Sequence, residues 1–204
     1  MAGPAVFVVT DIETDGPDPG AHSMLSFASV ARGAAGEDLG AFTINLLPLE
    51  GAIADPGTLR WWRAQPEAWA EATRDPVAPE EAIASFCAWV RGLPGRPVFV
   101  AHPLAFDGLW IDWYLRRFAG LRLFQGPWTR ERLFHGTGID LPSAVSGTLG
   151  WDYLDCRLEN YPTEWLGGHA HSHRALDDAL GYAHLLVELR RGALAGVRPG
   201  RADR

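Results

Sequence analysis

The chain has 204 residues, of which 47% are hydrophobic and 21% charged, and its formal net charge at pH 7 is −7. This length suits one domain with a sizeable core, and the composition is that of a soluble globular protein. No stretch approaches the roughly 18 uncharged apolar residues that a membrane-spanning helix needs. The N-terminus also lacks the basic region of a signal peptide. We therefore expect a cytoplasmic protein that has no membrane partner.

The cysteines and the charge balance give weaker indications. Cys87 and Cys156 lie far apart in the sequence, which favours reduced thiols over a disulfide framework. The acidic net charge argues weakly against a nucleic-acid partner, but carboxylates that surround metal ions also count as negative charges. All 18 basic residues are arginine, which fits either a coding bias or phosphate binding.

Hydrophobic patterning and turn signals predict the elements in chain order. Strands are expected at 5–14, 24–32, 39–48 and 96–102. Helices are expected at 57–65, 66–75, 79–93, 106–118, 140–150 and 173–191. Strands first, and then helices that alternate with strands, indicate one α/β domain over residues 1–192 with a mixed sheet covered by helices. Residues 193–204 have no core-forming pattern, so we expect a disordered tail.

Two carboxylates lie at the end of the first predicted strand. Strand side chains alternate, so Asp11 and Glu13 project from one face and Ile12 from the other. Two like charges that close are unfavourable unless a cation lies between them. The alternative is an ordinary polar end to the strand, because a turn-like segment follows.

Two further aspartates open predicted helices. Asp107 lies at the start of the 106–118 helix, where an aspartate ordinarily caps free N–H groups. In the last helix, Asp177 falls on the polar face, whereas Asp178 falls at the margin of the apolar face. A carboxylate there is costly unless it is paired or bound to metal. Asp178 is therefore the stronger functional candidate.

Three histidines precede that helix, at positions 169, 171 and 173. In one regular helix His173 and Asp178 would lie about 140° apart, so we expect His173 in a loop that closes over a site anchored by Asp178. A zinc site made of His169, His171 and His173 is an alternative. It is weak, because no cysteine and no second histidine cluster accompanies them.

In order along the chain, "DIET" (11–14), "HPLAFD" (102–107) and "HRALDD" (173–178) resemble the motifs of the DEDDh family of 3′→5′ exonucleases. This family includes proofreading subunits of replicative polymerases, ribonuclease T and oligoribonuclease. The resemblance covers residues 5–190. It implies a ribonuclease H-like α/β fold, with a central mixed five-stranded sheet flanked by helices. One departure is that Pro103 and Leu104 stand in the second motif, where many members have an asparagine nearby.

The resemblance also implies the site and its chemistry. Four residues match the acidic metal ligands: Asp11, Glu13, Asp107 and Asp178. His173 matches the general base, and His169 and His171 match nothing in the pattern. Two Mg²⁺ or Mn²⁺ ions would clamp the scissile phosphate, and a neutral imidazole would take the proton of the attacking water. The expected products are nucleoside 5′-monophosphates released from the 3′ end of single-stranded RNA or DNA, with RNA slightly favoured.

Expected substrate contacts follow from the same segments: Thr14, Leu25, Phe27, Trp61, Trp62, His102 and Phe106. The Thr14 backbone would hold the terminal 3′-hydroxyl, and Leu25 or Phe27 would wedge between bases. Strand packing is the alternative for Leu25 and Phe27, and core or lid packing for the two tryptophans, whose segment 58–65 resembles one in small exoribonucleases of the family. Five arginines form a dense basic stretch, which either binds the backbone of the nucleic acid or forms a solvated surface: Arg116, Arg117, Arg122, Arg130 and Arg132.

Other functions stay open at this point. The same fold occurs as an inactive nucleic-acid-binding module, although all five catalytic positions are filled here. Narrower nuclease alternatives are a proofreading-type DNA exonuclease and an enzyme for very short oligoribonucleotides. Single-domain exonucleases of this kind are often homodimers, and we carry a homodimer as an expectation.

Overall fold

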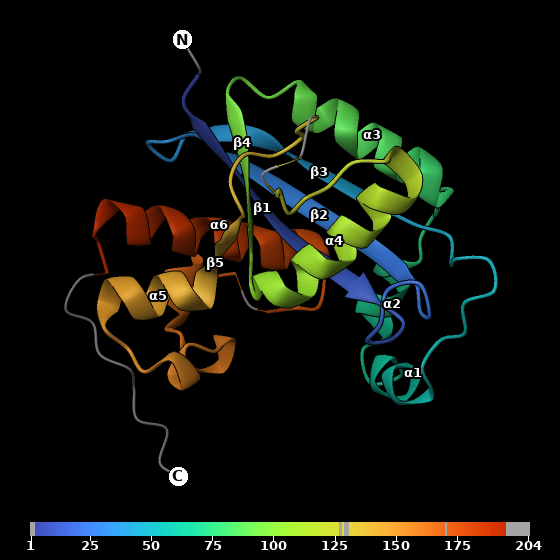
Figure 1. The fold of residues 1–204 in the computed structure, drawn as a ribbon. Coiled ribbons are helices and arrows are strands. Elements are labelled where there is room, and N and C mark those ends of the chain that lie inside the picture. The colour runs from blue at the N-terminus through green and yellow to red at the C-terminus, as the bar shows by residue number, and fades with distance from the viewer. Residues whose placement is uncertain (1–2, 127, 129–130, 170, 195–204) are drawn as a thin grey trace.

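A computed structural model describes residues 3–126, 128, 131–169 and 171–194 (Figure 1). Its centre is a five-stranded sheet in the order β3-β2-β1-β4-β5. The strands are β1 (Ala5–Thr14), β2 (Met24–Arg32), β3 (Asp38–Asn45), β4 (Arg96–Ala101) and β5 (Ile139–Asp140). β1 pairs antiparallel with β2 and parallel with β4, and β5 runs parallel to β4. The predicted mixed five-stranded sheet is confirmed.

Six helices accompany the sheet in the described part of the chain. They are α1 (Pro56–Trp62), α2 (Pro66–Ala72), α3 (Pro79–Arg91), α4 (Leu104–Ala119), α5 (Leu141–Leu149) and α6 (Ala175–Arg191). Figure 1 shows α6 along one face of the sheet, with α3 and α4 on the other. The prediction of a sheet flanked by helices is therefore confirmed.

Side-chain alternation in β1 explains the two layers. Phe7 and Val9 enter the core shared with α5 and α6, whereas Val8 and Ile12 enter the core shared with α3 and α4. Asp11 continues the series of Phe7 and Val9, so the strand carries its first carboxylate to the α6 side of the sheet.

The structure departs from the sequence expectations mainly in short elements. Sequence patterning gave no separate location for β5, which has two residues. It also missed three short 3₁₀ helices between α5 and α6, at Tyr153–Asp155, Leu158–Asn160 and Thr163–Leu166. Such short turns carry no hydrophobic period long enough to detect.

The α4 helix begins two residues earlier than expected. The side chain of Asp140, at the end of β5, accepts a hydrogen bond of 3.0 Å from the Leu104 backbone N–H. This contact satisfies one free donor at the start of the helix.

The C-terminal boundary also differs slightly from the expectation. Leu194 is buried in the α6 core, so packed chain continues past residue 192. The rest of the expected tail, 195–204, lies outside the described residues. Cys87 and Cys156 are both buried, free thiols. Among the described residues, no helix combines the length and apolarity that crossing a bilayer requires.

Candidate functional site

The candidate site lies where the ends of two parallel strands meet the starts of two helices. β1 and β4 run in the same direction, so their carboxyl ends share one edge of the sheet. Asp11 and Glu13 lie at the end of β1, and Asp107 lies in the first turn of α4, just after β4. Asp178 lies in the first turn of α6. The topology thus brings together four carboxylates, called here the acidic cluster: Asp11, Glu13, Asp107 and Asp178.

Three members of the acidic cluster are in close contact. Ligand oxygens of Asp11, Glu13 and Asp178 all lie within 4.8 Å of one another, and all three residues are buried. Among the described residues, no arginine forms an ion pair with any member of the cluster. Buried carboxylates without arginine partners are costly, and in the described chain only Asp178 has a basic neighbour, His171, so this arrangement fits a bound cation.

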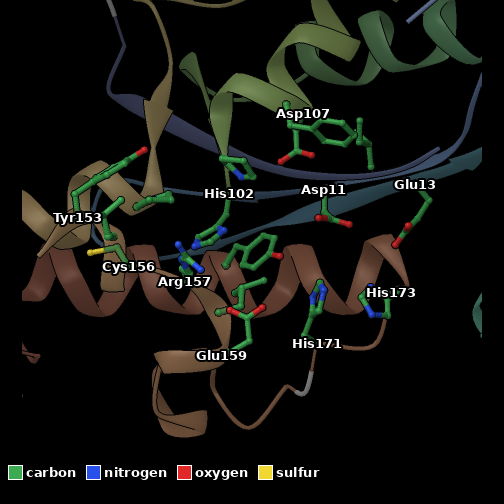
Figure 2. Close-up of a pocket in the computed structure, with 17 residues that line it drawn as sticks. Asp11, Glu13, His102, Asp107, Tyr153, Cys156, Arg157, Glu159, His171 and His173 are labelled. Atoms are coloured by element: carbon green, nitrogen blue, oxygen red, sulfur yellow. The ribbon is translucent and has the colours of Figure 1, made fainter. Parts of the chain in front are cut away.

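Asp107 completes the cluster from the other side. Its carboxylate faces that of Asp11 in Figure 2, and only 3% of the residue is exposed. Its Oδ2 atom is buried and has no hydrogen-bond partner in the described structure. An unpaired buried oxygen is the donor that a hard divalent cation requires. The cluster therefore fits Mg²⁺ or Mn²⁺ by its oxygen donors.

Burial and mutual repulsion shift the ionisation of these groups. Burial, and then the charge of Asp107, raise the pKa of Asp11 well above 3.8. Burial, and then Asp178, raise the pKa of Glu13 well above 4.5. The pKa of Asp107 is also raised well above 3.8 by burial, which a hydrogen bond from the His102 backbone offsets in part. Burial is the main cause of each shift, and repulsion by other members of the cluster adds to those of Asp11 and Glu13.

This repulsion predicts that removing one charge stabilises the metal-free protein. Between the ordinary carboxyl pKa and the raised value, the native state binds more protons than the unfolded state, so the free energy of unfolding falls as pH rises. Asp11→Asn abolishes one such group. We expect the variant to be more stable than wild type in EDTA, by a margin that grows as pH rises above about 4.

Urea unfolding of both proteins across pH measures this margin. His102 has its pKa lowered to about 4, mainly by burial, and contributes the opposite slope between that value and 6.5. This contribution is common to both proteins and cancels in their difference. A margin that stays constant with pH would contradict the predicted repulsion.

The loop before α6 is attached directly to Asp178. The backbone N–H groups of Ser172 and His173 donate to the two Asp178 carboxylate oxygens, at 2.9 and 3.0 Å. His173 has a φ of +57°, in the left-handed region, and α6 begins only at Ala175. The expectation that His173 precedes the helix and lies over a site anchored by Asp178 agrees with this placement. Asp178 is buried and Asp177 half-buried, as the helical pattern predicts.

His171 is a contact that sequence reasoning missed. Its Nδ1 lies 3.0 Å from Asp178 Oδ2, and its ring centroid lies 4.3 Å from that of His173. His169, in contrast, lies with its Cβ close to Gly181 of α6. The alternative of a zinc site made of His169, His171 and His173 is therefore wrong, because the group of possible metal ligands contains His171 and His173 but not His169.

The two tryptophans of α1 have different surroundings. Trp62 is buried, and its indole N–H donates to the Thr14 carbonyl at 2.9 Å. Trp61 is 41% exposed, and its ring centroid lies 4.7 Å from that of His173. Packing thus accounts for Trp62, while Trp61 remains accessible beside the loop histidine. The Thr14 hydroxyl donates to the Gly16 carbonyl.

The expected base wedges are not on the surface. Phe27 is fully buried in the core shared with α3 and α4. Leu25 is 3% exposed and packs against Trp62, Ala68 and Ala72. Both side chains instead pack in the interior, as in the alternative stated above. The expectation that either one wedges between bases is corrected on this ground.

A pocket of about 510 Å³ extends from the acidic cluster to the segment between α5 and α6 (Figure 2). That segment forms a second wall, made of Tyr153, Leu154, Cys156, Arg157, Leu158 and Glu159. Tyr153 and Leu154 are exposed, at 55% and 67%. Arg157 has no ion-pair partner among the described residues, and Figure 2 places it between Tyr153 and His171. The wall thus offers apolar surface and a free cation. Sequence patterning missed it, because the segment is irregular.

His102 and Phe106 also line this pocket. His102 stacks on Tyr182 of α6 at 5.2 Å between ring centroids, and its Nε2 lies 3.3 Å from the Tyr161 hydroxyl. Burial, and then Asp11, raise the pKa of Tyr182, so its hydroxyl stays protonated beside the acidic cluster. Phe106 is 36% exposed. Both expected contacts therefore border the pocket.

The dense arginine stretch lies elsewhere. Arg116 and Arg117 are exposed in the last turn of α4, at the opposite end from Asp107. Arg122 pairs with Asp112 at 3.2 Å. Arg130 lies outside the described residues, and none of the other four lines the pocket. These four side chains instead lie on the solvated surface, as in the alternative stated above.

Comparisons with solved structures address the fold. The nuclease domain of 3′hExo, a DEDDh family member, in a structure bound to rAMP, superposes with a TM-score of 0.64 and 11% identity, over 98% of this chain and 97% of that one. E. coli Exonuclease I with a dT13 oligonucleotide gives a TM-score of 0.64 and 20% identity, over 93% of this chain. The chain has the fold of the DEDDh exonucleases. It spans only 42% of the Exonuclease I chain.

A third structure agrees with this fold. A 3′-exonuclease that recognises the 3′ end of histone mRNA stem-loop matches with a TM-score of 0.61 and 10% identity, over 98% of this chain and 85% of that one. No protein-family model matches the sequence, and no curated protein matches it. The fold is therefore seen through structure rather than through sequence similarity.

Proposed function

We propose that this protein is a metal-dependent 3′→5′ exonuclease of the DEDDh type that acts on single-stranded nucleic acid. The observation that carries the proposal is the acidic cluster: four buried carboxylates to which the described residues supply no arginine partner, one of them with an unpaired oxygen, beside a loop histidine. The order of these residues along the chain matches the family motifs, and the fold is the one in which those motifs work.

The acidic cluster would hold two divalent ions, Mg²⁺ or Mn²⁺. When bound, such ions neutralise the carboxylates, lower the pKa of an attacking water and stabilise the leaving 3′ oxygen. The chain's part is to fix the positions of the donors. Asp11 and Glu13 are held by strand pairing, while Asp178 is held by two backbone N–H groups of the loop. Ligands held in this way lose little freedom when a cation binds.

His173 would accept the proton of the attacking water. Burial, and then the neighbouring His171, lower the pKa of His173 below 6.5, so its imidazole is neutral at pH 7. A neutral imidazole beside the acidic cluster can act as a general base. Trp61, in edge contact with the ring, restricts its orientation.

The pocket suggests a path for the strand. A cavity of about 510 Å³ is large enough for a nucleotide and the start of its neighbour. Phe106 and Tyr153 offer rings on which bases can stack, and Arg157 can pair with a backbone phosphate. The acidic net charge of the chain is compatible with this function, because phosphates would meet the metal ions and Arg157.

RNA is the substrate we favour. The support is the resemblance of segment 58–65, which contains Trp61, to small exoribonucleases of the family. DNA remains the competing substrate, since a single contact to a 2′-hydroxyl separates the two sugars.

The function is tested with matched single-stranded RNA and DNA labelled at the 5′ end, each with Mn²⁺ or with EDTA. We expect a Mn²⁺-dependent ladder that shortens from the 3′ end and releases nucleoside 5′-monophosphates, and the faster substrate identifies the preferred sugar. If the protein binds either strand but cleaves neither with any divalent ion, the nuclease proposal fails and the protein is an inactive nucleic-acid-binding module.

Arg157 provides a quantitative prediction about binding. If its guanidinium pairs with one phosphate, Arg157→Ala lowers by about 0.7 the slope of log affinity against log salt for a single strand. Fluorescence anisotropy with a labelled oligonucleotide at several salt concentrations measures this slope. Arg132→Ala, an exposed arginine away from the pocket, is the matched control and should leave the slope unchanged. Equal slopes in wild type and Arg157→Ala would exclude the phosphate contact.

A further inference from the structure

Two histidines and a carboxylate converge at the start of α6 in a way that the proposed hydrolysis does not require. One ligand atom each from His171, His173 and Asp178 lie within 4.8 Å of one another. His171 Nδ1 lies 3.0 Å from Asp178 Oδ2. The proposed hydrolysis uses His173 and Asp178, which leaves His171 without a role.

The local backbone explains why these three groups meet. Ser172 and His173 are attached to the Asp178 carboxylate through their N–H groups, and the left-handed φ of His173 turns the chain into α6. The two rings lie at 76° to one another, with their centroids 4.3 Å apart. His169, two residues earlier, instead packs its Cβ near Gly181.

This donor set differs in chemistry from the acidic cluster. Imidazole nitrogens suit Zn²⁺ and other late first-row ions, whereas Mg²⁺ prefers oxygen donors. Three protein ligands and one open position are the arrangement of a tetrahedral zinc site that also holds water. Metal–ligand bonds of about 2.0–2.2 Å place tetrahedral ligands about 3.4 Å apart. The ligand atoms here lie within 4.8 Å of one another, so the widest pair must close by at most about 1.4 Å, which rotation of the His171 and His173 side chains can supply.

We propose that His171, His173 and Asp178 form a second metal site, selective for Zn²⁺ or a similar nitrogen-preferring ion, in addition to the acidic cluster. Asp178 belongs to both sets of ligands. Zinc at this site engages the imidazole of His173 and an oxygen of Asp178, so both are withdrawn from hydrolysis. The inhibition rests on the proposed function, whereas the binding itself does not.

The binding is tested by titrating zinc ion into the untagged, EDTA-stripped protein by calorimetry, in a large excess of Mg²⁺ that occupies the oxygen donors. We expect one zinc per chain in wild type and in His169→Ala. In His171→Ala the affinity should fall at least about tenfold, the lower end of what loss of even an outer-shell contact costs a zinc site. Thermal melting checks that each variant is folded. Unchanged affinity in His171→Ala, an equal loss in His169→Ala, or no binding by wild type would overturn the proposal.

The inhibition is measured as the ratio of Mn²⁺-dependent activity with and without added zinc, within each protein. We expect a large ratio in wild type and in His169→Ala and a much smaller one in His171→Ala. This comparison holds whatever activity His171→Ala has in Mn²⁺ alone. If zinc binds as predicted and no protein has nuclease activity with any ion, the nuclease proposal fails and the zinc site stands. Equal ratios in all three proteins would overturn the inhibitory role.

Discussion

Replacing Asp178 with asparagine is expected to lower the rate of metal-dependent 3′→5′ degradation by about a thousandfold or more. The residue is 3% exposed and belongs to the group of three carboxylates whose oxygens lie within 4.8 Å. An amide of the same size removes the charge that a divalent ion needs, and its NH₂ group also gives up one of the two hydrogen bonds that the carboxylate accepts from the loop. Loss of several kcal/mol of charge stabilisation corresponds to about that factor in rate.

The adjacent aspartate is a matched control for this effect. Asp177 lies on the half-exposed side of the same helical turn, and its side chain accepts a hydrogen bond of 3.3 Å from the Ser172 hydroxyl. Asp177→Asn should therefore keep activity close to that of wild type in the same assay. Similar losses in both variants would mean that the helix start, and not the Asp178 carboxylate, is what the activity depends on.

Replacing His173 with alanine is expected to lower kcat by about a hundredfold to ten thousandfold, the usual contribution of a general base. The loss should also change the pH profile. In wild type the rate falls as pH drops below the His173 pKa, which burial and His171 hold below 6.5, because protonation removes the base. The residual activity of His173→Ala should lack this acidic limb. Single-turnover rates across pH measure both effects.

His169→Ala serves as the control in this experiment, because that histidine belongs to the same loop and does not line the pocket. We expect a wild-type rate and a wild-type acidic limb. An acidic limb that persists unchanged in His173→Ala would assign the titrating group to another residue.

Periodicity predicts the acidic part of the site well, for a physical reason. Asp11 and Glu13 share a face because strand side chains alternate, and Asp178 is buried because its position on α6 faces the core. Neither pattern can show that the two elements meet. That information came from the ordered motifs, and the structure adds the pairing of β1 with β4 and the packing of α6 on the sheet.

The other half of the pocket was beyond sequence reasoning. Arg157 and Tyr153 lie in a segment of short 3₁₀ turns, which has no period to detect. His171 looked like a spare loop residue, because its contact with Asp178 depends on the turn at His173. For Phe27 the sequence left a base contact and strand packing both open, and the structure has it packed in the core.

The central claim is that the acidic cluster binds two divalent ions in positions suited to phosphodiester hydrolysis. The most direct test is a crystal of the protein grown with Mn²⁺ and a nucleoside 5′-monophosphate, with anomalous diffraction used to locate the manganese. The account predicts two anomalous peaks about 4 Å apart among Asp11, Glu13, Asp107 and Asp178, with the phosphate between them. Absence of manganese from these carboxylates at saturating concentration would contradict it.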